Sequence, residues 1–170
     1  SDVYKRQGLE INFPSLSSSH KAKVKQTLND YVEVDNPLDY HTFIWGDRKR
    51  TSECFSAMMS GQFAATMLLL DWPKSKESEQ KDWDATLFAL SDALSGTSEK
   101  AIVLASMADC MPKRIIEECL SLGIAPMVGL DVCLKALNHS YKIGRAFSSN
   151  SSPDLEVLRN SSEHKSKQQL

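Results

Sequence analysis

The longest apolar run of the chain, residues 63–70, limits most strongly what the sequence can fold into. A helix that crosses a bilayer needs about twenty apolar residues, and this run of eight is far too short. Because the run is continuous rather than alternating, it predicts a central parallel strand that is covered on both faces. The sequence therefore favours an α/β domain without a transmembrane segment.

Strand-like and helix-like segments alternate along most of the chain. Apolar runs predict strands at residues 8–13, 63–70, 101–106 and 124–128, with a short extended piece at 32–34. Helices are expected between them, capped by one of Ser17, Ser18 and Ser19 in the first case and by Asp47 in the second. The predicted inward faces are Val24 and Leu28; Cys54, Phe55, Met58 and Met59; Trp83, Leu87, Leu90 and Leu94; Ile115, Ile116, Cys119 and Leu122; and Val132, Ala136, Leu137 and Tyr141.

Alternation with short connections predicts a parallel sheet with right-handed crossovers and helices on its faces. The expected fold class is therefore α/β, an open three-layer α/β/α sandwich. Ligands of such sheets lie at the carboxyl ends of the strands. The loops that would form a site there are residues 35–47, 71–76, 107–111 and 129–131.

Charge and motif content exclude several function classes. The chain has 20 basic and 22 acidic side chains and no basic cluster, so it lacks the electrostatic basis for nucleic-acid binding. It contains no glycine-rich dinucleotide motif, no P-loop and no Gly-x-Ser-x-Gly, the parts that dinucleotide binding, NTP hydrolysis and serine hydrolysis require. The four cysteines are widely spaced, which predicts buried, reduced thiols of a cytoplasmic protein and no metal site.

One loop concentrates chemically capable residues: Asn36, Pro37, Asp39 and His41. His41 would need an orienting carboxylate to act as a nucleophile or general base, and Asp39 is two residues away. In the alternative, structural interpretation, Asn36 and Asp39 bond loop backbone groups. The loop's aromatic side chains would then hold it against the domain: Tyr40, Phe43 and Trp45.

Two other carboxylates, Asp71 and Asp109, follow predicted strands, where a receiver domain keeps its phosphate-accepting aspartate. A receiver also needs an acidic pair after its first strand and a lysine after its last, and neither is present. Ser106 and Asp109 are instead expected to cap the helix that follows them.

Three spaced motifs resemble those of a known family. Gly8-Leu9-Glu10 is followed by Pro14-Ser15-Leu16-Ser17, then by a predicted helix, then by Asn36-Pro37-Leu38-Asp39. This series resembles the signature of the NDP-forming acyl-CoA ligases, such as ADP-forming acetate-CoA ligase, which are relatives of succinyl-CoA synthetase. It matches the second of their two flavodoxin-like ligase domains, over residues 8–144. The resemblance implies a mostly parallel, flavodoxin-like sheet.

The resemblance also implies a reaction: acyl-CoA, phosphate and ADP interconvert with a free acid, CoA and ATP, through an acyl phosphate and a phosphohistidine. In the family that histidine lies upstream, in a Ser-His-Thr-Gly-like segment that this chain lacks, so no catalytic residue is expected here and His41 does not take that role. Asn36, Pro37, Asp39 and His41 would instead face the phosphohistidine region and shape it.

The implied partners are the CoA-binding and ATP-grasp domains of the same polypeptide or complex, and a small-molecule acid as substrate, with neither nucleic acid nor membrane. CoA, ATP or ADP, and magnesium are expected for the full-length enzyme, and none is expected to bind this chain alone. The alternative function is a non-catalytic flavodoxin-like binding or regulatory module of a larger fusion protein. A complete receiver-like domain, phosphorylated on Asp71, is a third interpretation.

The ends of the sequence differ from its middle. Residues 1–7 resemble a translated sequencing adaptor and are expected to be an artefact, 8–144 an incomplete ligase domain, and 145–170 a linker with the start of an ATP-grasp module. In a flavodoxin-like strand order of 2-1-3-4-5 the first strand is central. If that strand is missing, residues 8–13 lose a neighbour on one side, and we expect them to be loosely held or to pair wrongly across the gap; full pairing in a normal sheet would contradict this.

Overall fold

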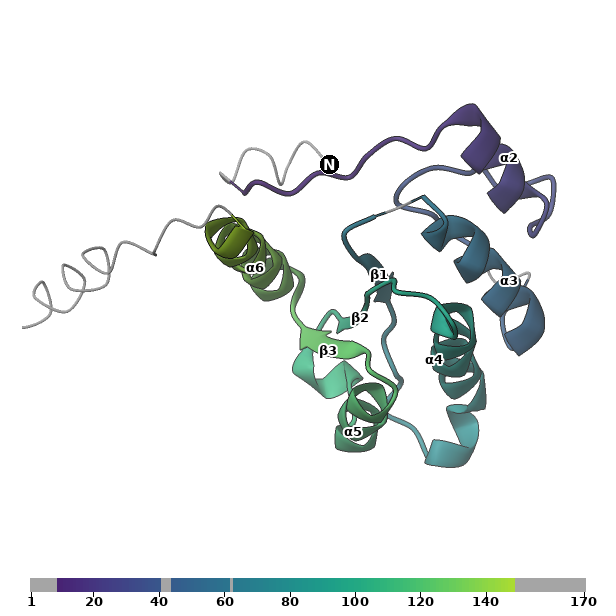
Figure 1. Ribbon diagram of the computed structural model, residues 1–170. Helices are drawn as coiled ribbons and strands as arrows, with labels where there is room; N and C mark the ends of the chain where they lie inside the picture. Colours follow the sequence, from purple (N-terminus) through teal and green to yellow (C-terminus); the bar gives the residue numbers. More distant parts are fainter. Residues whose placement is uncertain (1–8, 41–43, 62, 149–170) are drawn as a thin grey trace, which may run out of the picture. The chain divides into compact units, whose positions relative to one another are not determined.

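The computed structural model describes residues 9–40, 44–61 and 63–148 (Figure 1). The chain divides into two compact units, Ser1–Leu134 and Lys135–Leu170. The described elements are α2 (Ser18–Lys25), α3 (Arg48–Met59), β1 (Thr66–Leu69), the short 3-10 turn η2 (Glu77–Glu79), α4 (Lys81–Leu94), β2 (Ala101–Ala105), the 3-10 turn η3 (Ala108–Cys110), α5 (Lys113–Ser121), β3 (Ala125–Val128) and α6 (Leu130–Ser148). No helix in the described ranges is long and apolar enough to cross a membrane.

The three strands form one parallel sheet in the order β1-β2-β3. Leu68 of β1 lies opposite Val103 of β2, which in turn lies opposite Pro126 of β3. Helix α4 connects the first pair of strands and α5 the second, so each parallel neighbour is reached through a helix. The predicted α/β class with a parallel sheet is confirmed, and the order is consistent with a flavodoxin-like arrangement.

The main core lies between one face of this sheet and its helices. Val103 is fully buried in β2 and packs in a cluster with α4 and α5 side chains such as Leu87, Leu90 and Ile115. These positions recur at helical spacing in the sequence, and the predicted inward faces of both helices are confirmed. Each large aliphatic side chain that is removed from water in this way stabilises the fold by about 1.5–3 kcal/mol.

A second core cluster holds the N-terminal part of the described chain together. Helix α2 contributes Val24 and the turn after it Leu28, and both pack with Cys54 and Ala57 of α3. Helix α3 also contributes Phe55 and Met59 to the main core. The four predicted residues of α3 therefore all pack into the interior, but they divide between two clusters, because the helix lies between α2 on one side and α4 on the other (Figure 1).

Two of the predicted helix starts are confirmed by their caps. The Ser17 side chain accepts a hydrogen bond from the His20 backbone N–H at 3.2 Å, and Asp47 accepts one from Arg50 at 3.1 Å. Both satisfy backbone donors that the first helical turn leaves without an intrahelical partner. The predicted inward face of the last helix is wrong at both of its ends, since Val132 and Tyr141 are exposed, while Cys133 and Leu134, which were not predicted, are buried.

The first predicted strand is absent in its described part. Residues 9–13 belong to no sheet, and residues 32–34 form no strand either, although Val32 and Val34 are buried. The strand prediction for residues 8–13 is therefore wrong for residues 9–13, and Gly8 lies outside the described residues. A strand forms only when a neighbour completes its hydrogen-bond ladder, and an apolar sequence cannot supply that neighbour by itself.

Candidate functional site

The structure brings two of the three spaced motifs together. The Asn36 side-chain N–H donates to the backbone carbonyl of Pro14 at 3.0 Å, across a separation of 22 residues. Beside this bond, Leu16 and Val34 are buried in the same apolar cluster, and Leu38 packs against it. The motif residues thus form one local structure, in which an asparagine fixes the chain that leads into α2.

The predicted site residues lie on the loop that begins at this bond. Asn36 is half-buried, while Pro37 and Asp39 are exposed. The peptide bond between Asn36 and Pro37 is cis. His41 lies outside the described residues, so its place in the loop stays a prediction.

Aromatic side chains attach this loop to the domain, as the structural interpretation of the loop predicts. Tyr40 meets Phe55 of α3 edge to face, with ring centroids 5.3 Å apart, and Trp45 meets Trp83 of α4 in the same geometry at 5.2 Å. Such pairs add about 0.5–1.5 kcal/mol beyond the area they bury. Burial raises the pKa of the Tyr40 hydroxyl to about 12. The third predicted anchor, Phe43, lies outside the described residues.

A second polar group forms where β1 and β2 end. Asp71 accepts two hydrogen bonds from Ser106, one from its backbone N–H and one from its hydroxyl, each at 2.7 Å. Lys74 pairs with Asp109 at 2.6 Å, and this ion pair lowers the pKa of the Asp109 carboxyl. The expectation that Ser106 and Asp109 cap the next helix is wrong, because both side chains bond across to the loop after β1 instead.

Behind this group lies a half-buried network centred on Asp84 of α4. Arg114 donates to both carboxylate oxygens, at 3.0 and 3.1 Å, and the Trp72 indole donates to one of them at 3.0 Å. Gln80 accepts a further bond from Arg114. The network ties the loop after β1, the start of α4 and α5 to one another.

Two hollows lie near these groups. One, of about 420 Å³, lies on the outer side of the Asp84 network, and the residues that line it include Lys74, Asp109 and Arg114. The cations in its wall already have carboxylate partners, so the hollow carries no free positive charge among its described residues.

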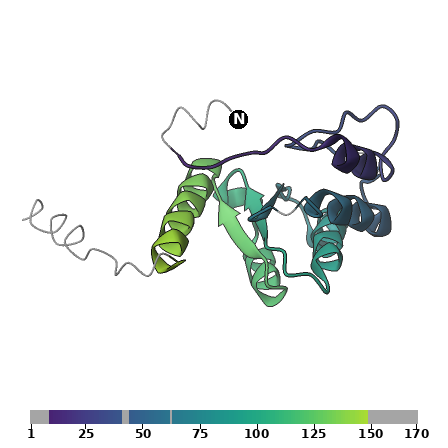
Figure 2. The ribbon, with the colours of Figure 1, turned by 45° about the horizontal axis from the view of Figure 1, so that its top comes forward.

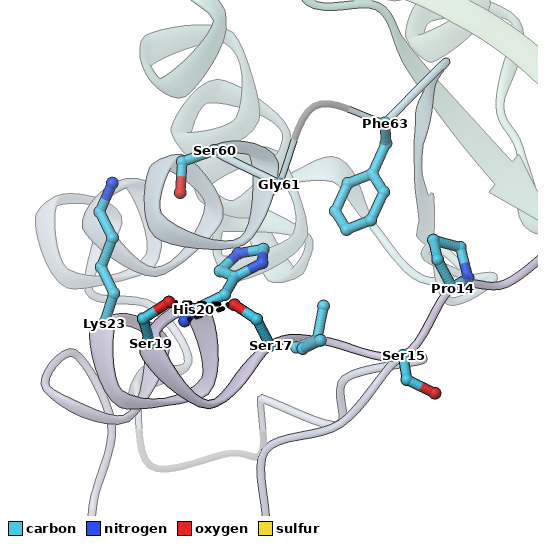
Figure 3. Close-up of a pocket in the computed structure, with 10 residues that line it drawn as sticks. Pro14, Ser15, Ser17, Ser19, His20, Lys23, Ser60, Gly61 and Phe63 are labelled. Atoms are coloured by element: carbon cyan, nitrogen blue, oxygen red, sulfur yellow. Dashed lines mark hydrogen bonds between the residues drawn. The ribbon is translucent and has the colours of Figure 1, made fainter.

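The other hollow, of about 510 Å³, lies between the start of α2 and the end of α3 (Figure 3). The His20 ring nitrogen Nε2 is 2.9 Å from the carbonyl of Ala57, and the imidazole stacks obliquely near Phe63 at 6.0 Å between centroids. Gly61 lies directly above this imidazole. A β-carbon there would come within 2.6 Å of His20 and 2.7 Å of Phe63, so only glycine fits without a shift.

Sequence reasoning missed the Asp84 network and the role of His20. Trp72, Asp84 and Arg114 lie on three different elements, and no periodicity or motif links them. The polar stretch around His20 predicts a solvated surface side chain, whereas His20 is half-buried and hydrogen-bonded in the structure. The sequence offers only local signals: Trp72 follows the end of a predicted strand, and Asp84 lies near the start of a predicted helix.

Cysteines and metal ligands complete the chemistry of the described chain. All four cysteines are free, with Cys54, Cys119 and Cys133 buried and Cys110 half-buried. Within residues 9–40, 44–61 and 63–148, no three His, Cys, Asp or Glu side chains are grouped so as to hold a metal ion.

Comparison with protein families, with curated proteins and with solved structures finds no match to this chain.

Proposed function

We propose that this chain is part of an NDP-forming acyl-CoA ligase and corresponds to its second flavodoxin-like ligase domain. The ligase interconverts acyl-CoA, ADP and phosphate with a free acid, CoA and ATP. In this proposal the phosphohistidine belongs to a part of the enzyme outside this chain, and the chain alone is inactive.

The observation that supports this proposal best is the hydrogen bond from Asn36 to the carbonyl of Pro14. The resemblance rests on spaced motifs, and spaced motifs carry weight when their residues contact one another in the fold. Asn36 and Pro14 do so here through this bond, and Leu16 and Leu38 of the same motifs pack in one apolar cluster. The parallel order β1-β2-β3 agrees with the strand order that the resemblance implies.

The finer features of the ligase follow as parts of the same proposal. The domain is a three-layer α/β/α sandwich, and the protein is cytoplasmic. CoA, the nucleotide and magnesium are held by the CoA-binding and ATP-grasp domains of the same polypeptide or complex.

In this ligase the loop with Asn36, Pro37, Asp39 and His41 shapes the region that receives the phosphohistidine. Asn36 does so by holding the loop against the segment before α2. Asp39 is exposed on the same loop and supplies polar contact. None of these side chains forms a covalent intermediate.

The test is to recover the longer coding sequence and to assay the encoded protein for release of free CoA from acetyl-CoA with ADP and phosphate. In that protein Asn36→Ala and Asp39→Ala should lower turnover several-fold while the protein stays folded. Asn29→Ala is the matched control for Asn36→Ala. Asn29 is also half-buried, but the described hydrogen bond at this residue goes to its backbone carbonyl, which the substitution keeps.

Two results would count against the proposal. Unchanged turnover in both variants would remove the loop from the ligase mechanism. A longer protein without a Ser-His-Thr-Gly-like segment and without CoA release would instead favour the non-catalytic binding or regulatory module.

A further inference from the structure

Three backbone carbonyls that follow α2 converge on the side-chain ammonium of Lys25. This group donates to the carbonyl of Asn29 at 3.0 Å, to that of Asp30 at 2.7 Å and to that of Val32 at 2.6 Å. A lysine ammonium has three N–H donors and no acceptor, so the three carbonyls engage all of its donors. We call these three carbonyl groups the carbonyl cradle.

The carbonyl cradle has the chemistry of a cation site. Three carbonyl oxygens that point to one place repel one another unless a positive charge lies between them. Backbone carbonyls are also the groups that replace the hydration shell of a monovalent cation in a selective channel. The Val32 N–H closes the same turn by donating to the Asn29 carbonyl at 3.1 Å. The turn therefore combines one backbone bond with three bonds to a single cation.

The other lysines of α2 show that this arrangement is specific to Lys25. Lys21 lies one helical turn earlier and pairs with Asp35 at 3.3 Å, but both side chains of this pair are exposed, so the pair contributes little. Lys23 is exposed and makes no hydrogen bond or ion pair within the described part of the chain. Lys23 is therefore a matched control for Lys25 on the same helix.

The carbonyl cradle lies just before the loop of the candidate site. After α2 the chain turns back, so that Asn36 reaches the carbonyl of Pro14 in front of the same helix (Figure 2). Between the cradle and Asn36, the side chain of Val34 is buried. The position of the turn therefore determines how residues 29–36 approach Asn36 and the loop that follows it.

We propose that the carbonyl cradle is a binding site for an ammonium-type cation, that Lys25 fills it in this protein, and that it holds residues 29–36 in place only while it is filled. When the lysine ammonium is removed, free ammonium ion takes its place, because it has the same charge and the same N–H donors. Tetramethylammonium has the charge but no N–H donor, and it does not bind. The proposal does not depend on the ligase function, since it uses only contacts within residues 14–36.

The experiment follows amide hydrogen exchange of the Val32 N–H by NMR in the 170-residue chain, in ammonium chloride and in tetramethylammonium chloride at equal ionic strength. In tetramethylammonium chloride, Lys25→Met should exchange this proton about tenfold faster than the wild-type chain, because bonds to a charged group are lost. Ammonium chloride should restore most of the protection. Lys23→Met should match the wild-type chain in both salts.

A second measurement uses the wild-type chain, so it decides the question even if Lys25→Met does not fold. Because its three donors are engaged, the ammonium protons of Lys25 should exchange slowly with water and give an NMR signal of their own, whereas those of Lys23 should not. The proposal is overturned if the two lysines behave alike, or if Val32 is equally protected in the wild-type chain and in Lys25→Met. It is also overturned if both salts restore protection equally, if ammonium restores none, or if Lys23→Met loses as much protection as Lys25→Met.

Discussion

Asp71 and Ser106 join the ends of β1 and β2 through two hydrogen bonds of 2.7 Å to the two oxygens of one carboxylate. Asp71 is the second residue after β1, and Ser106 directly follows β2. The pair therefore closes the carboxyl edge of the sheet, the place where a ligand of an α/β domain would be expected. A carboxylate with both oxygens engaged in this way stabilises the edge and is not presented as an open phosphate acceptor.

We expect Asp71→Ala to lower the free energy of unfolding by about 1–2 kcal/mol, because two hydrogen bonds to a charged group are lost. Ser106→Ala should lower it by less, since the backbone N–H of residue 106 still donates. Urea denaturation of each variant measures these changes. The control is Asp109→Ala, an aspartate whose ion pair with Lys74 is exposed and should contribute little; an equal loss in the control would contradict the role assigned to Asp71.

We expect a larger loss of stability than at Asp71 when one partner is removed from the Asp84 network. Asp84→Ala leaves the half-buried guanidinium of Arg114 without its bidentate carboxylate, and it removes the acceptor of the Trp72 indole. Because the half-buried charge then keeps only the exposed Glu77, at 3.7 Å, as a counterion, we expect a loss of about 2–3 kcal/mol.

The double variant Asp84→Ala with Arg114→Met provides the control for this prediction. It removes the stranded charge together with its partner, so it should be less unstable than the sum of the two single variants. Strict additivity in chemical denaturation would show that the two side chains do not act as a pair.

The hollow beside α2 makes Gly61 sensitive to a single methyl group. Gly61→Ala places a β-carbon within 3 Å of both His20 and Phe63, and relieving that overlap should lower the free energy of unfolding by about 1–3 kcal/mol. Gly144→Ala is the matched control, because no atom lies within 4 Å of a β-carbon at that helical position. There the same substitution should be neutral or stabilising, since alanine favours helix. Thermal unfolding of both variants tests the contrast, which disappears if Gly61→Ala is as stable as Gly144→Ala.

Because the Tyr40 hydroxyl is buried, we expect the protein to lose stability at alkaline pH. Its pKa is raised from 10.0 to about 12 by burial, so between these values the unfolded state has released a proton that the folded state keeps. The unfolded state then binds fewer protons, and the free energy of unfolding falls as pH rises. The stabilising contribution is complete below pH 10 and is lost as pH passes through about 12.

The variant Tyr40→Phe keeps the aromatic contact with Phe55 and has no hydroxyl to ionise. Urea midpoints measured from pH 9 to 12 should therefore fall less steeply in the variant than in the wild-type chain. Parallel curves would mean that Tyr40 does not titrate in this range. The Cys119 thiol, whose pKa burial raises to about 11, contributes in the same direction in both proteins and cancels from the comparison.

Local features of the sequence predicted much of this fold. The caps Ser17 and Asp47 are correct because a capping side chain bonds a backbone N–H only two or three residues away, so sequence distance and spatial distance coincide. The inward faces of α4 and α5 are correct because their apolar spacing is set by the helix itself. The strand at residues 101–105 is correct because a continuous apolar run has no polar face to expose.

The candidate site was predicted less well. The loop at Asn36 was found from its composition, but its bond to Pro14 was not, because no rule relates residues 22 positions apart. The sequence predicted that Ser106 caps the next helix, because that helix is its nearest partner along the chain. In the structure the Ser106 hydroxyl instead donates to the Asp71 carboxylate, which follows the neighbouring strand.

By itself, the sequence determined the helices and the apolar runs that form the three strands, through periodicity, capping residues and continuous apolar character, but it did not separate these runs from residues 9–13, which form no strand. The tertiary structure decided which strand lies at the edge, how α3 divides its apolar residues between two clusters, and which carboxylate Arg114 and Ser106 bind. The physical reason is range: backbone periodicity acts within a few residues, whereas a strand's neighbours and a buried charge's counterion come from segments that only the folded chain brings together.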